Sequence, residues 1–176
     1  MNDLYAFTVP VFIKQLGGLK NVLAKAESFA KEKNISEESF LNERLAPDMF
    51  PLVKQVQLSS DHAKGATARL AGLEVPKFED NEKTFAELYA RIDKTIAFVQ
   101  SDPTAMFADA ATREIALAYW KGKHMNGLDY LRESALPNFY FHVTVAYCLV
   151  RHMGVALGKS DYINGLSLMG EETAAA

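Results

Sequence analysis

Two histidines and a short polar stripe are the residues of this sequence whose types and spacing suit chemistry. Gln55, Ser59 and His62 fall within about 60° of one another if their segment is a helix with 100° per residue, and Asp48 shares this stripe. His142 lies in the aromatic run 139–143, where an imidazole is expected to be partly buried and to need a polar partner. Neutral imidazoles can bind a divalent metal, accept a proton or hydrogen-bond a ligand.

The polar stripe borders an apolar seam, which leaves two interpretations open. The seam consists of Met49, Leu52, Val53, Val56, Ala63 and Leu70, interrupted by Ser60 and Thr67, and the expected solvent side carries Lys54, Gln57, Asp61 and Lys64. Stripe residues at such an edge can simply border solvent, or they can form an inward-facing polar site. His142 is in turn either a hydrogen-bonded core residue or a ligand-binding one.

The remaining reactive side chains give weaker signals. His152 lies about 80° from His142 on one helix and is expected at a rim or in the core, whereas His124 is expected in an exposed polar loop. Cys148 is expected to be a packing thiol. The sequence contains no Gly-rich phosphate loop, HExxH, paired CxxC or GxSxG motif, which argues against nucleotide binding and serine-hydrolase chemistry.

Four long helices are expected to position these residues. Apolar side chains recur at three- and four-residue steps from Phe12 to Ala30 and from Phe85 to Val99. Gly17 and Gly18 interrupt the first pattern, and we expect another backbone to approach closely there. The second helix is expected from near Asp48 to about Leu70, and the last from Pro137 to a stop at Gly158.

The connections between these helices also carry signals. Ser36 is expected to cap a short helix that Pro47 closes, and residues 101–103 end the third long helix. Residues 114–120 are ambiguous between helix and strand, and Asn126-Gly127 favours a tight turn. A long crossover with a small β-hairpin over residues 104–136 fits this pattern. The fold class is therefore expected to be all-α, a four-helix bundle.

Composition limits the classes of partner. The chain has 176 residues, 49% hydrophobic and 23% charged, with one cysteine and a net charge of −3, so we expect one domain over 1–176 and no nucleic acid partner. No apolar run approaches about 20 residues and residues 1–4 do not resemble a signal peptide, so we expect a cytoplasmic protein without a membrane partner. Residues 170–176 are expected to be a frayed tail.

Several segments together resemble a known family. They are Arg44 to Leu52, Gln55-Val56, Asp61 to Lys64, Leu136 to His142 and Arg151-His152. Over nearly the whole chain the sequence is similar to a bacterial family of unknown function that is grouped with the DinB/YfiT-like proteins, a superfamily of proposed metalloenzymes. The resemblance implies a four-helix bundle, frequently a homodimer, and relatives that bind a divalent metal through three histidines and include thiol-dependent transferases and hydrolases.

The resemblance assigns roles residue by residue. His62 matches the histidine of the second helix, and His142 matches the first histidine of an HxxxH pair in the last helix, whereas Ala146 occupies the second position of that pair. Asp48 would lie about 21 Å along a regular helix from His62, too far to share its metal. Gln55 and Ser59 suit hydrogen bonding better than ligation.

Three functional hypotheses follow. In the first, His62 and His142 bind a divalent metal, zinc or nickel, in a hydrolase or thiol-dependent transferase with a degenerate histidine site. In the second, the chain binds a small molecule without metal, with Trp120, Tyr140 and Phe141 as an aromatic wall and Gln55, Ser59 and His62 as polar anchors. In the third, the chain is a structural homodimer whose histidines are satisfied core residues.

Overall fold

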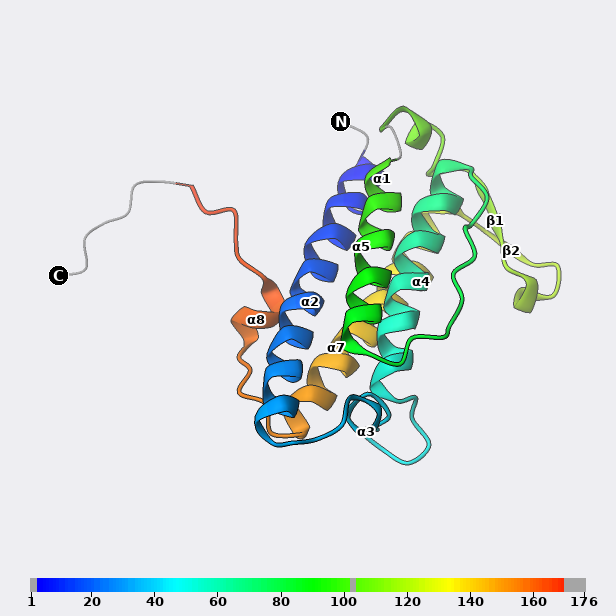
Figure 1. The fold of residues 1–176 in the computed structure, drawn as a ribbon. Coiled ribbons are helices and arrows are strands. Elements are labelled where there is room, and N and C mark those ends of the chain that lie inside the picture. Colours follow the sequence, from blue (N-terminus) through cyan, green and yellow to red (C-terminus); the bar gives the residue numbers. More distant parts are fainter. Residues whose placement is uncertain (1–2, 102–103, 170–176) are drawn as a thin grey trace.

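The computed structural model describes residues 3–101 and 104–169, and they form a bundle of four long helices. These are α2 (Val9–Glu32), α4 (Leu52–Ala71), α5 (Phe85–Ser101) and α7 (Leu136–His152). α2 and α4 each pack against both α5 and α7, so the four helices enclose one core (Figure 1). The predicted all-α four-helix bundle is therefore confirmed.

The first long helix lies against a short C-terminal helix that the sequence did not predict. α1 (Asp3–Ala6) precedes α2, and α8 (Lys159–Ile163) packs against α2. A Cβ on Gly18 would lie 3.0 Å from the Tyr162 carbonyl oxygen, so the predicted close approach at the glycine pair is confirmed. The predicted helix stop at Gly158 is wrong. α7 ends at His152, before Gly154 with φ of 101°, and Gly158 caps α8.

The helix that carries the polar stripe begins later than predicted. Pro51 is its N-cap with extended backbone, φ −69° and ψ 168°, so Asp48 lies in the preceding turn rather than on α4. The short helix α3 (Glu37–Leu41) has the predicted cap, since the Ser36 hydroxyl accepts a hydrogen bond from Ser39 N at 3.2 Å. α3 ends at Leu41, so the prediction that Pro47 closes this helix is wrong.

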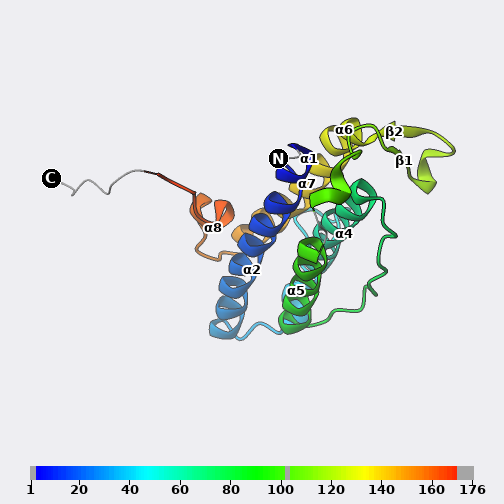
Figure 2. The same ribbon diagram turned by 90° about the horizontal axis from the view of Figure 1, so that it is seen from above.

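The crossover contains the small hairpin that the sequence suggested. β1 (Glu114–Ala116) pairs antiparallel with β2 (His124–Asn126), and the turn between them includes the 3₁₀ turn η2 (Ala118–Trp120). Asn126-Gly127 is not the tight turn: Asn126 Oδ1 accepts from Asp129 N at 2.8 Å and caps α6 (Gly127–Asp129). Figure 2 shows the hairpin projecting beside α6.

Two irregular turns complete the crossover. The 3₁₀ turn η1 (Thr104–Phe107) follows α5, and the π-helical turn η3 (Tyr130–Ala135) leads from α6 into α7. η3 packs against both α7 and α4, so it places its side chains against the helix that carries His62.

The α4 face that was expected in solvent is partly buried: Lys54 and Asp61 are half-buried, but Gln57 and Lys64 are buried, which corrects the prediction for these two. Gln57 and Lys64 are 4% and 6% exposed, because the connection between α4 and α5 returns along α4 (Figure 1). Arg91, on α5, anchors this connection through ion pairs with Asp61 at 2.8 Å, Asp80 at 3.0 Å and Glu82 at 2.8 Å. Gln57 Nε2 donates to Glu82 Oε2 at 2.8 Å, and Lys64 pairs with Asp61 at 2.9 Å, so both of these buried side chains have polar partners.

Two further expectations concern the C-terminal tail and membrane-spanning helices. The predicted frayed tail at 170–176 lies outside the described residues. None of the helices in the described part combines the length and the apolar character that crossing a bilayer requires.

Candidate functional site

α4 and α7 bring the two predicted histidines into contact. The His62 and His142 rings are stacked, with centroids 5.3 Å apart and planes inclined by 13°. His142 is 8% exposed, and His62 is half-buried beside it. The sequence distance between them is 80 residues, so the bundle creates this pair.

Gln55 fixes the protonation of His142. The Gln55 amide donates from Nε2 to the Phe50 carbonyl at 3.0 Å, which turns Oε1 toward His142 Nδ1 at 2.8 Å. Because Oε1 can only accept, Nδ1 must carry the proton, and His142 Nε2 keeps a free lone pair. The side chain of Gln55 is 1% exposed, so water does not compete for this hydrogen bond.

Both histidines are held in the neutral form. Burial, with a smaller contribution from His62, lowers the pKa of His142 to about 4. The pKa of His62 is also lowered, mainly by burial, while Asp61 opposes the shift and the positive charge of Arg69 adds to it. At neutral pH the pair therefore offers imidazole nitrogens rather than positive charges.

The other predicted members of the stripe do not join the pair. Ser59 is fully buried and donates its hydroxyl to the Gln55 carbonyl at 2.8 Å, within its own helix. Asp48 is exposed in the turn before α4. Besides His62 itself, Gln55 is thus the stripe residue that contacts His142.

The predicted aromatic wall is divided between separate places. Tyr140 shares a face of α7 with Thr144 and Tyr147, both of which contact Tyr162 of α8. Burial, with a smaller contribution from Tyr162, raises the pKa of Tyr140. Trp120 packs edge-on against Tyr130, with ring centroids 6.2 Å apart. Among the three aromatic residues proposed from the sequence, Phe141 contacts the pair, 5.3 Å from the His142 ring and 55% exposed.

The remaining predicted histidines and the cysteine lie elsewhere. His124 is exposed on β2, with Nδ1 3.7 Å from Glu114, and His152 is exposed at the end of α7. Cys148 is half-buried. None of these three contacts the His62–His142 pair.

The donor set fits a divalent metal in part. The pair offers two neutral imidazoles, and Nδ1 of His142 is held by Gln55. Histidines that bind a metal through one ring nitrogen commonly have the other nitrogen held in this way. A three-histidine centre does not fit, because Ala146 occupies the third position and is fully buried. Within the described residues, no three His, Cys, Asp or Glu side chains are grouped to hold a metal.

Two neighbouring residues were missed in the sequence. Arg69 lies seven residues after His62, on nearly the same face of α4, and its Nη1 donates to the Tyr130 hydroxyl at 3.2 Å. The signal was the spacing of Arg69 from His62, with Gly65 between them. Tyr130 had no such signal, because η3 brings it to α4 from the crossover.

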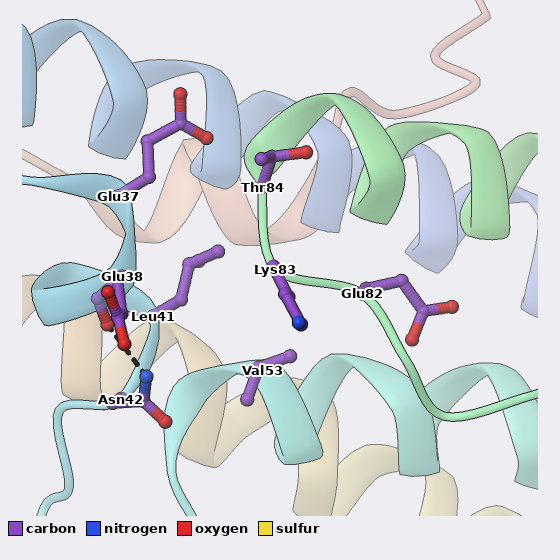
Figure 3. Close-up of a pocket in the computed structure, with 8 residues that line it drawn as sticks. All are labelled: Glu37, Glu38, Leu41, Asn42, Val53, Glu82, Lys83 and Thr84. Carbon is purple, nitrogen blue, oxygen red and sulfur yellow. Dashed lines mark hydrogen bonds between the residues drawn. The ribbon is translucent and has the colours of Figure 1, made fainter.

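A hollow of the surface lies away from the histidines. It measures about 630 Å³ and is lined by residues of α3, α4 and the connection that leads into α5. They are Glu37, Glu38, Leu41, Asn42, Val53, Glu82, Lys83 and Thr84 (Figure 3). Val53 projects about 180° from His62 on α4. Two of the carboxylates that line the hollow already have partners, since Glu37 accepts from Phe85 N at 2.7 Å and Glu82 pairs with Arg91. The histidine pair therefore remains the candidate site.

Comparison with known proteins identifies the family. No curated protein matches the chain. A solved structure described as a DinB family member protein from Shewanella denitrificans is 42% identical, with a TM-score of 0.92 over 96% of each chain. The family model described as a domain of unknown function (DUF1993) matches residues 4–163. The chain therefore belongs to the DUF1993 family, and its fold is DinB-like.

Proposed function

We propose that the His62–His142 pair is the centre of a metal-dependent enzyme site, with both imidazoles as ligands of a divalent ion such as zinc or nickel. The observation that supports this most strongly is the Gln55–His142 hydrogen bond, which leaves Nε2 of a neutral imidazole free to bind. The remaining positions on the ion are open to water or to a substrate, because the chain supplies two histidines rather than three.

The reaction class is the one that the family resemblance implies, hydrolysis or thiol-dependent transfer. A bound divalent ion would supply Lewis acidity to a substrate oxygen or a coordinated thiol, as hydrolysis or thiol-dependent transfer requires. Gln55 orients His142, whereas Ala146, one turn further along α7, is fully buried and has no side-chain atom that could bind a metal. Phe141 provides an exposed aromatic surface beside His142 that can cover an apolar part of a substrate.

Elemental analysis of untagged protein purified without chelators tests the proposal. We expect near-stoichiometric zinc or nickel in the wild-type protein and its loss in both His62→Ala and His142→Ala, whereas His152→Ala, at an exposed histidine, should retain it. Circular dichroism must show that the variants remain helical. Metal retained in both site variants, or absent after incubation of the wild-type protein with zinc, nickel or manganese, would rule out this site.

A second candidate function uses the same histidines without metal. The rings are stacked with nearly parallel planes, so their in-plane lone pairs do not converge on one point unless a ring rotates. In this function the pair hydrogen-bonds a small molecule or accepts its proton. Thermal stabilisation of chelator-treated protein by a small molecule, lost in His142→Ala, would support it.

The homodimer and the cytoplasmic location remain predictions from the sequence. Light scattering on the purified protein would measure the mass in solution and decide between monomer and dimer.

A further inference from the structure

Arg69 extends back along α4 toward the histidine pair. Its Nη1 lies 2.5 Å, and its Cζ 3.5 Å, from the point where a Cβ on Gly65 would be. Gly65 is one helical turn before Arg69 and three residues after His62, a rise of about 4.5 Å between the Gly65 and His62 levels. The guanidinium therefore lies on the side of α4 that carries His62, close enough for its charge to act on the imidazole.

No carboxylate in the described part of the chain forms an ion pair with Arg69. Its side chain donates instead to the Tyr130 hydroxyl, which is neutral. Two other arginines differ in this respect, since Arg91 pairs with three carboxylates and Arg132 pairs with Asp129 and Glu133. Arg113, like Arg69, has a neutral partner, the Leu70 carbonyl at the end of α4.

Tyr130 adds a directed donor to this guanidinium. Its hydroxyl accepts from Arg69 Nη1, so its own proton remains free to be donated to a third group. The residue is 3% exposed, and burial raises its pKa, which keeps the hydroxyl protonated at neutral pH. A half-buried guanidinium beside a phenolic donor is suited to an acceptor with several oxygens.

We infer that Arg69 and Tyr130 bind the anionic group, a carboxylate or a phosphate, of a small molecule whose reacting part lies at His62 and His142. The placement of the reacting part rests on the proposed function, whereas anion binding by Arg69 does not require a metal. Gly65 is part of this anion site, because a side chain there would occupy the space of the guanidinium.

Titration of chelator-treated protein with two probes, inorganic phosphate and succinate, tests the inference. Trp120 is the only tryptophan and its ring packs against Tyr130, so its fluorescence reports events at this site. We expect saturable fluorescence change and thermal stabilisation with at least one probe, compared with sodium chloride at the same ionic strength. Response to phosphate alone or to succinate alone identifies which anion the site takes.

Three variants locate the binding. Arg69→Met should lower the affinity for the anion by about tenfold or more. Arg132→Met removes the same charge from an exposed and already paired arginine, so it should leave that affinity unchanged. Gly65→Ala keeps the charge but displaces the flexible guanidinium, so it should weaken binding while the alanine favours the helix.

The outcomes separate this inference from the metal site. Equal affinity in the wild-type protein and Arg69→Met, or no response of the folded wild-type protein to either probe at millimolar concentration, overturns the inference. The metal proposal is decided by elemental analysis of the histidine variants, in which Arg69 is still present. Either proposal can therefore fail while the other holds.

Discussion

At the scale of single residues, the site depends on one amide that determines what an imidazole can do. The sequence indicated His62 and His142 through helical spacing and family resemblance, and the structure places their rings in contact. It could not indicate that Gln55 holds Nδ1 of His142, because that bond joins residues 87 positions apart. Tyr130 was likewise unpredictable, since an irregular crossover positions it.

Substitution of Gln55 should change the titration and the affinity of His142. In Gln55→Glu a carboxylate beside the ring favours the imidazolium, so the pKa of His142 should rise above about 4. In Gln55→Leu the Nδ1 proton loses its acceptor, and metal or ligand affinity should fall by about 10- to 100-fold. NMR titration of the histidine ring signals measures the first effect, and calorimetric titration the second.

The control for these variants is Gln57→Leu. Gln57 is also buried on α4 and also loses a hydrogen bond, but its partner is Glu82 on the opposite side of the helix. The pKa of His142 should be unchanged in that variant. An unchanged His142 pKa in Gln55→Glu would show that Gln55 does not set the state of the ring.

At the scale of elements, helix faces were predictable from periodicity, whereas buried charges were not. The apolar steps from Phe85 to Val99 identified α5, but nothing in that spacing indicated that Arg91 within it is buried. It is 4% exposed because the connection after α4 folds back and supplies its carboxylates. A charged residue is expected to be exposed unless other parts of the chain supply oppositely charged partners, and helical spacing alone does not reveal those partners.

The glycine pair of α2 allows a direct test of the docking of α8. In Gly18→Ala the new Cβ would lie 3.0 Å from a backbone oxygen of Tyr162, which cannot rotate away. We expect α8 to loosen and the melting temperature to fall, although alanine favours an isolated helix by about 1 kcal/mol. Hydrogen exchange at the amides of α8 measures the loosening.

Gly17→Ala is the matched control, because its Cβ would meet only the Asn164 side-chain amide at 3.1 Å. That amide is flexible, so the variant should be as stable as the wild-type protein or slightly more stable. Equal behaviour of the two variants would show that contact with α8 does not explain the glycine at position 18.

At the scale of the whole molecule, the bundle buries an ionisable pair that only the neutral form tolerates. α4 and α7 are closely packed along their length, and both His62 and His142 have lowered pKa values chiefly through burial. The four-helix arrangement was predictable because each helix carries an apolar face. The neutral state of the pair was not, since it depends on how deeply the assembled helices bury the rings.

Burial of His142 should make the fold sensitive to mild acid. Between pH 6.5, the ordinary pKa, and about 4, the folded-state pKa, the unfolded chain binds a proton that the folded chain does not. The stability that His142 contributes is therefore complete above pH 6.5 and is lost as the pH falls toward 4, by at most about 3 kcal/mol. Denaturant unfolding across this range measures the loss.

The non-titrating variant His142→Gln separates this effect from other acid effects. Its free energy of unfolding should fall less over the same range, whereas His152→Gln, at an exposed residue, should parallel the wild-type protein. The carboxylates with lowered pKa values, among them Asp80 and Asp161, lose their charges at lower pH and so contribute mainly below this range. Parallel curves for His142→Gln and the wild-type protein would mean that His142 is protonated in the folded bundle as readily as in the unfolded chain.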